Sequence, residues 1–124
     1  MIASVNDLEV YRRSKELYPK VIAATKLYPP NEFHLRDQTC RAANGIHACI
    51  AEGFGRSVAE FKMYLTRALG SCNETISHLD DAVRCYFVVR ETGTLLIAQY
   101  TNSRQATLSP TRTMEVGTIP TSNF

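Results

Sequence analysis

Apolar side chains recur at steps of three and four residues along most of the chain, which is the spacing of one helical face. The longest run predicts a helix of roughly eight turns. It begins at Ser57, which has Glu60 three residues later, the spacing of a capping box. A helix this long in a short chain can bury its apolar face only against antiparallel helices of similar length, as in an up-and-down bundle. Its apolar positions are Phe61, Leu65, Ala68, Leu69, Cys72, Ile76, Leu79, Val83 and either Tyr86 or Phe87.

An earlier segment, Asp7 to Tyr28, has the same periodicity. Asn6 or Asp7 is its predicted N-cap, and the pair Pro29 and Pro30 ends it. Pro19 lies inside the pattern, and we expect it to bend the helix because the periodicity resumes beyond it. The predicted buried positions are Leu8, Tyr11, Tyr18, Val21, Ile22 and Thr25.

The second segment runs from about Phe33 to Phe54 and has an unusually small buried face. Gly45 in its centre costs about 1 kcal/mol relative to alanine, so we expect a neighbouring helix to approach closely there. Gly53 and Gly55 are predicted to supply the conformational freedom for the following turn. The buried face consists of Leu35, Thr39, Ala42, Ala43, Ile46, Ile50, Gly53 and Phe54.

A fourth helix is expected in "TLLIAQYTNSRQATLSP", after a break at Thr92-Gly93. Its predicted apolar positions are Leu95, Leu96, Tyr100 and Leu108, and its Thr, Ser and Asn residues are weak helix formers. Pro110 ends or kinks it. We therefore predict one bundle domain over residues 1–110 and a frayed or disordered tail over residues 111–124.

Composition narrows the class of protein further. The chain has 124 residues, which suits one domain, and 14 Lys and Arg against 12 Asp and Glu give a charge of +2, well short of a dedicated nucleic-acid binder. No apolar run or leader pattern suggests a membrane span or secretion, so a cytoplasmic location is expected. The four cysteines are Cys40, Cys49, Cys72 and Cys85. They show no metal-binding spacing and are predicted to be reduced core residues. We expect neither a metal nor a cofactor.

Three stretches carry a resemblance to a known family: "DLEVYRRSKEL", "RDQTCRAANGIHACIAEGFGR" and "EFKMYLTRALGSCNE". Over about Asp7 to Val89 the chain resembles the small bacterial four helix bundle protein family, also called the 23S ribosomal RNA intervening-sequence protein family. His47 and Cys49 depart from it, because the family commonly has a proline and an asparagine at these positions. This departure suggests a straighter second helix.

The resemblance implies an all-α, antiparallel, up-and-down, left-handed four-helix bundle. Members often assemble as homopentamers and have no established enzymatic activity. They are encoded within inserts in ribosomal RNA genes or elsewhere in bacterial genomes. A related accessory protein of diversity-generating retroelements is associated with a reverse transcriptase and with nucleic acid.

One candidate site is a polar cluster of Gln38, Arg41, Glu52 and Glu74. Gln38 and Arg41 share a helix face, and Glu52 lies three turns further on. The cluster is interpreted either as a ligand site or as ion pairs that fix the register of helices or subunits. We favour the second interpretation, because buried charges persist mainly when they are paired.

Catalysis finds little support in the sequence. His47 and Cys49 are two residues apart on a helix and point about 200° from one another, so they cannot form a nucleophile and base pair. Surface imidazoles and core thiols are the simpler interpretation. "EGFGR" is not preceded by a strand and lacks the spacing of a phosphate-binding loop. The sequence therefore predicts no enzyme.

The second candidate site is a set of basic residues. On one subunit they form a solvated face, whereas a cyclic oligomer would repeat them as a ring of positive potential able to hold nucleic acid. Tyr11 and Tyr18 are candidates for stacking on bases or for core packing. The main hypothesis is an oligomeric, noncatalytic scaffold that binds RNA or DNA, and the alternative is a bundle that recruits another protein. The basic set is Arg12, Arg13, Lys15, Lys20, Lys26, Arg36, Arg56 and Arg67.

Overall fold

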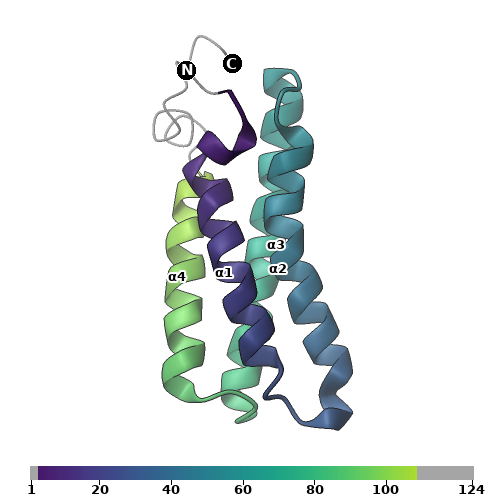
Figure 1. Ribbon diagram of the computed structural model, residues 1–124, viewed down its shortest axis with the longest axis vertical. Coiled ribbons are helices and arrows are strands. Elements are labelled where there is room, and N and C mark those ends of the chain that lie inside the picture. Colours follow the sequence, from purple (N-terminus) through teal and green to yellow (C-terminus); the bar gives the residue numbers. More distant parts are fainter. Residues whose placement is uncertain (1–2, 109–124) are drawn as a thin grey trace.

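The structure is a computed structural model in which residues 3–108 are described, and it contains four long helices (Figure 1). Consecutive helices run antiparallel, and α1 also packs against α4, which closes the bundle (Figure 1). The predicted all-α up-and-down four-helix bundle is therefore confirmed. The elements in order are η1 (Val5–Asp7), α1 (Glu9–Thr25), η2 (Pro30–Glu32), α2 (Phe33–Gly53), α3 (Val58–Arg84) and α4 (Arg90–Leu108).

The core runs along the bundle axis and receives side chains from every long helix. Phe61, Leu79 and Tyr100 are fully buried, and Ile50 and Val21 meet them from α2 and α1. The helical faces predicted for α2 and α3 supply nearly half of this core. Residues 109–124 lie outside the described residues. The predictions of a tail over residues 111–124 and of a helix end or kink at Pro110 therefore fall outside them as well.

The first helix begins later than predicted. Ser4 caps the short 3-10 helix η1, in which its hydroxyl accepts from Asn6 N–H while Asp7 accepts from the Ser4 backbone. The α1 helix then starts after Leu8, which offers no side-chain cap, so the prediction of Asn6 or Asp7 as its cap was wrong. It ends at Thr25 rather than Tyr28. Pro19 lies within the continuous helix, as predicted.

The buried face of α1 also contains residues that the pattern missed. Val10, Ser14, Leu17 and Ala24 are buried, whereas Tyr11, Tyr18 and Ile22 are only half-buried. Ser14 can lie in the core because its hydroxyl donates to the Val10 carbonyl oxygen at 2.8 Å. Its polar atom is thus satisfied inside its own helix.

Two glycines of α2 lie against α3, and we call this close contact the α2–α3 seam (Gly45, Gly53, Tyr64 and Ser71). A Cβ atom at Gly45 would come within 2.9 Å of Ser71 Oγ, which confirms the predicted close approach. A Cβ atom at Gly53 would lie 2.5 Å from Tyr64 Cβ. Gly53 is therefore required for packing, and Gly55 alone provides the turn, with a φ of +84°.

The α3–α4 connection differs from the prediction. The α3 helix ends at Arg84, because Tyr86 takes a left-handed φ of +62°, so its ring lies outside the core. Thr92 and Gly93 do not interrupt the helical structure, because both lie in the first turns of α4. Gly93 permits the contact with α3, since a Cβ atom there would come 2.3 Å from Val83 Cγ2.

The buried face of α4 is formed largely by small and polar residues. Leu96 and Tyr100 are buried as predicted, but Leu95 is exposed. Ser103 and Thr107 complete the face, and the Thr107 hydroxyl donates to the Ser103 carbonyl oxygen. The side chain of Leu108 lies outside the described part of the structure.

The cysteines are free but do not all belong to the core. Only Cys72 is buried. Cys40 and Cys49 are half-buried, and Cys85 is exposed just after α3. The prediction of four core thiols was therefore wrong for three of them. It relied on the tendency of free cysteines to be buried, whereas the position of each cysteine in the fold decides its burial.

Candidate functional site

The α2–α3 face brings together three of the four predicted cluster residues. Gln38, Arg41 and Glu74 line a depression of about 350 Å³ between the two helices, together with Ser71. Glu52 lies apart from them, near the C-terminal end of α2. The depression and Glu52 thus occupy separate positions on this face.

The charges of this face are exposed rather than buried in pairs. Arg41 Nη1 lies 3.7 Å from Asp37 Oδ2 on the same helix, and 80% of its side chain is accessible. Each ion pair found within residues 3–108 likewise joins residues four apart in the sequence. All lie within one helix except Arg56–Glu60, which joins the α2–α3 turn to the first turn of α3. The ion pairs of the described chain therefore do not fix one helix against another.

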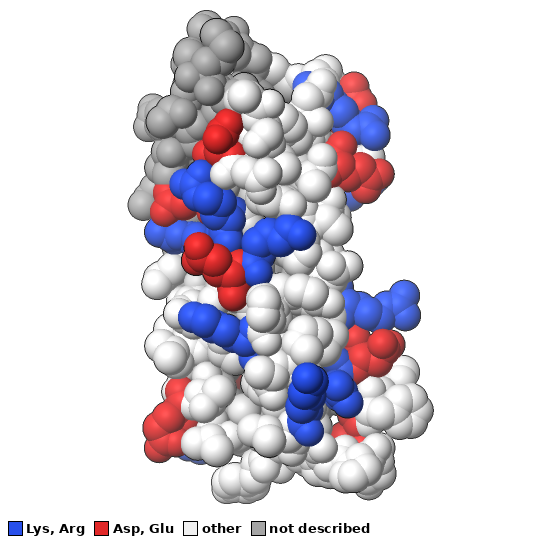
Figure 2. Space-filling view, in the orientation of Figure 1, with Lys and Arg blue, Asp and Glu red and all other residues white. Residues whose placement is uncertain are grey.

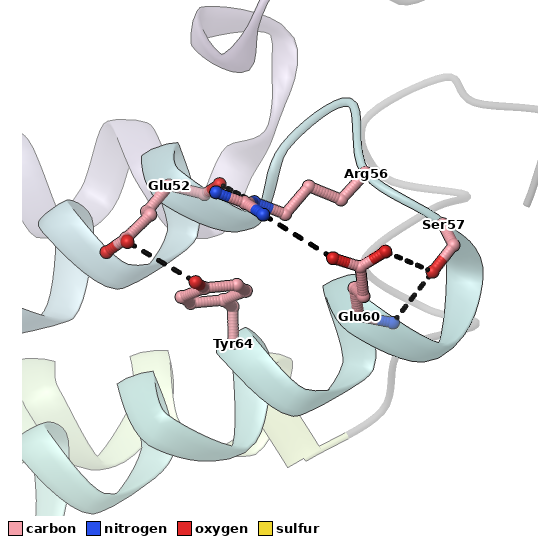
Figure 3. A network of polar contacts seen from close by, with 5 residues as sticks. All are labelled: Glu52, Arg56, Ser57, Glu60 and Tyr64. Atoms are coloured by element: carbon pink, nitrogen blue, oxygen red, sulfur yellow. Dashed lines mark hydrogen bonds and ion pairs between the residues drawn. The ribbon is translucent and has the colours of Figure 1, made fainter.

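Glu52 belongs to a polar network at the turn between α2 and α3 (Figure 3). The Tyr64 hydroxyl donates to Glu52 Oε1 at 3.3 Å, and Arg56 Nε donates to the Glu52 carbonyl oxygen at 2.8 Å. Ser57 caps α3, because its Oγ accepts from Glu60 N–H and donates to Glu60 Oε1. The hydrogen bond from Ser57, followed by that from Arg56, lowers the pKa of the Glu60 carboxyl.

Two arginines of the basic set lie over the ring of Tyr64. The guanidinium carbons of Arg56 and Arg67 are 5.2 and 5.0 Å from the ring centroid, within cation–π range. Tyr64 is itself buried against Gly53. The α2–α3 seam thus holds these two cations in place, far along the chain from the basic residues of α1.

The remaining basic residues lie mainly on α1. Arg13 Nη2 pairs with Glu9 at 2.6 Å, and Arg12 donates to the Asn6 carbonyl oxygen. Lys15 lies 5.7 Å from the centroid of the Tyr11 ring. Figure 2 shows that basic and acidic side chains are interspersed over the face that presents α1. Exposed Lys20, Lys26 and, in the first turn of α2, Arg36 complete this part of the set.

Tyr11 and Tyr18 contact a buried histidine that sequence reasoning placed at the surface. His47 is only 6% exposed, and its ring meets Tyr11 and Tyr18 edge-on at centroid distances of 6.3 and 5.3 Å. Its Nε2 bonds Asn44 Oδ1 at 3.1 Å. Burial, and then the charge of Lys15, lower the pKa of His47. The two tyrosines therefore contribute to packing between α1 and α2.

A groove between α1 and α4 was missed in the sequence. It has a volume of about 250 Å³ and is lined by Arg13, Glu16, Leu17, Lys20, Gln99 and Asn102. The spacing of the four α1 residues, i, i+3, i+4 and i+7, places them on one helix face. This spacing was the available signal, but three of the four residues are charged and were assigned to solvent.

One end of the bundle exposes large apolar side chains. Leu27 and Phe33 flank the α1–α2 connection, and Tyr86 and Val89 lie in the α3–α4 connection at the same end (Figure 1). Tyr86 is the most exposed of these, at 87%. We call these four residues the apolar end.

The described residues contain no group of three or more His, Cys, Asp or Glu side chains placed to hold a metal ion. No helix within residues 3–108 is long and apolar enough to cross a membrane.

Comparison with known proteins identifies the family. No curated protein matches the sequence. A solved structure of a protein of unknown function from the S23 ribosomal protein family of Bacteroides thetaiotaomicron has the same fold, with a TM-score of 0.75 and 25% sequence identity. The alignment covers 80% of this chain and 94% of that one. The family model described as "23S rRNA-intervening sequence protein" matches residues 6–108, so the chain belongs to that family.

Proposed function

We propose that this protein is a noncatalytic, oligomeric scaffold that binds RNA or DNA through a repeated basic surface. The observation that carries the proposal is the set of exposed cations on α1 and at its C-cap. Lys15, Lys20 and Lys26 are exposed and make no ion pair within residues 3–108. Cations free of ion pairs are available to bind phosphate and release its counterions.

The α2–α3 face is the proposed assembly surface, and a homopentamer is the expected oligomer. Ala48, a small and exposed residue of α2 on this face, allows a helix of another copy to approach. Arg41 and Glu74 at the depression, with Glu52 further along, provide both signs of charge for pairing with a neighbouring copy. Such pairing would give Arg41 and Glu74 partners beyond their own helices, on which they pair with Asp37 and His78.

Binding to labelled RNA and duplex DNA over a salt series, with native mass measured on the same sample, tests this function. Affinity should fall linearly on a log–log plot. The variant Lys15→Glu/Lys26→Glu should weaken binding and lower the salt slope by about two. Lys62→Glu/Arg90→Glu is the matched control, because it makes the same charge change at exposed positions outside α1. Equal loss in both variants, or no binding at low salt, would contradict the proposal.

The apolar end favours the alternative function, recruitment of another protein. Exposed clusters of large apolar side chains commonly mark protein interfaces. In that case Phe33→Ser/Tyr86→Ser would abolish complex formation, while Lys15→Glu/Lys26→Glu would leave it unchanged. The two functions therefore respond to different variants.

A further inference from the structure

The groove between α1 and α4 combines hydrogen-bonding groups with an apolar wall. Arg13, Glu16 and Lys20 line it from α1, with Leu17 between them, while Gln99 and Asn102 line it from α4. Leu17 is buried and the charged side chains are accessible. A planar ligand could therefore lie against Leu17 while its edge meets charged and amide groups.

Gln99 provides a second observation that points to a ligand. Its Oε1 atom is buried and has no hydrogen-bond partner within the described residues. Buried acceptors are nearly always satisfied, so an unpaired one needs an explanation. Rotation of the carboxamide toward the groove would let a ligand N–H group supply the missing bond.

We propose that this groove binds one unpaired base of a single-stranded nucleic acid, with Gln99 and Asn102 contacting the edge of the base. The proposal rests on the proposed nucleic-acid binding and adds the form of nucleic acid and the residues that select it. Carboxamides pair with base edges, and a glutamate such as Glu16 accepts from an exocyclic amino group. Lys20, which makes no ion pair within residues 3–108, is placed to bind a flanking phosphate, whereas Arg13 already pairs with Glu9.

The shape of the groove favours a single strand over a duplex. Proteins read duplex bases by inserting a convex element into the major groove, whereas a concave site takes a base out of the stack. The volume of about 250 Å³ is below the roughly 300–1,000 Å³ of pockets that hold a drug-sized ligand, so it suits one base. The groove also lies on the side of the bundle opposite the α2–α3 face, so assembly through that face leaves it open.

Fluorescence anisotropy with labelled single-stranded oligo(A), oligo(C) and oligo(U) RNA and with duplex RNA tests the inference on the full chain. The wild-type protein should prefer one homopolymer over the others by about tenfold and should bind single strands more tightly than duplex. Gln99→Leu should reduce the preference to about twofold, because the amide that reads the base is lost. Gln105→Leu, an exposed position on the same helix, should keep the full preference.

Asn102→Leu is a second test if Gln99→Leu does not fold, because Asn102 is exposed on α4. Retention of the full preference in the folded groove variants would overturn this inference, as would a wild-type protein that binds all strands and duplex equally. In both cases the proposed nucleic-acid function would stand. No binding of any nucleic acid at low salt would overturn both.

Discussion

Gly53 lies so close to Tyr64 that a Cβ atom on the glycine would come within 2.5 Å of Tyr64 Cβ. The contacted atoms are the Cβ and ring of a buried tyrosine, which cannot easily move aside. The ring is also held by Arg56 and Arg67 and by the hydrogen bond to Glu52. The C-terminal end of α2 and the first turns of α3 therefore pack as one unit.

Gly53→Ala should lower the free energy of unfolding by up to about 2 kcal/mol. Overpacking costs about 1–3 kcal/mol, and the better helix propensity of alanine offsets about 1 kcal/mol. Urea unfolding measures this difference. Gly70→Ala is the matched control, because a Cβ atom there meets nothing within 4 Å, and it should stabilise the protein by about 0.5–1 kcal/mol. Equal effects of the two substitutions would contradict the close contact at Gly53.

Tyr100→Phe should leave the protein as stable as the wild type or stabilise it by up to about 1 kcal/mol. The Tyr100 side chain is fully buried, and its hydroxyl has no hydrogen-bond partner within the described residues. Removing an unsatisfied polar group removes its desolvation cost. Tyr100→Ala should cost about 3–5 kcal/mol, because it leaves a cavity. A marked loss of stability in Tyr100→Phe, measured by thermal unfolding, would show that the hydroxyl is bonded.

The stability of the protein should fall as the pH drops below about 6.5, in part because of His47. Its pKa is lowered in the folded protein, so the unfolded chain takes up the proton first, and acid therefore favours unfolding. Urea unfolding from about pH 8 to about pH 5 measures the slope. His47→Gln should flatten this slope, and His34→Gln, at an exposed position, should not. Identical slopes in all three proteins would exclude a contribution from His47.

The cysteines should react with iodoacetamide in the order of their exposure. Cys85 is exposed and should react first, whereas Cys72 should react only when the protein unfolds. Burial raises the pKa of Cys72 to about 11, and its thiol donates to the Tyr100 carbonyl oxygen at 3.3 Å. Peptide mapping after a short labelling pulse gives the order. Equal labelling of Cys72 and Cys85 in the native protein would contradict this packing.

Arg41→Ala should reduce the native mass of the oligomer, because Arg41 lies on the proposed assembly face and is widely exposed within its own chain. Arg36→Ala is the control. Arg36 lies five residues before Arg41 on the same helix, so its side chain points about 140° away from that of Arg41. Native mass spectrometry compares the two variants. An unchanged mass in Arg41→Ala would count against the assembly role of the cluster.

The helix α2 and the start of α3 could be predicted almost to the residue. Their apolar faces are unbroken, and Ser57 marks the start of α3. The start of α4 could not be predicted in the same way, because glycine usually marks a break and here permits contact with Val83. Burial of Ser14 and Thr107 was also hidden, since each hydroxyl bonds a carbonyl oxygen of its own helix.

The candidate sites were less predictable than the fold. Spacing along a helix placed Gln38 and Arg41 on one face, but it could not show that Glu52 lies apart from Glu74 or that the charges are exposed. The predicted basic set likewise does not form one surface. Arg56 and Arg67 lie over Tyr64 and are separate from the basic residues of α1. The groove depends on the distance between α1 and α4, which no local pattern contains.

The α2–α3 seam also sets where related proteins can diverge without changing their architecture. A larger residue at Gly53 would push two helices apart, so substitutions there are confined to what the space allows. The exposed residues that line the groove between α1 and α4, Glu16, Lys20 and Asn102, can change size and charge independently of the core. A lineage could therefore acquire new ligands on one side of the bundle while the opposite side keeps the same sequence for structural reasons.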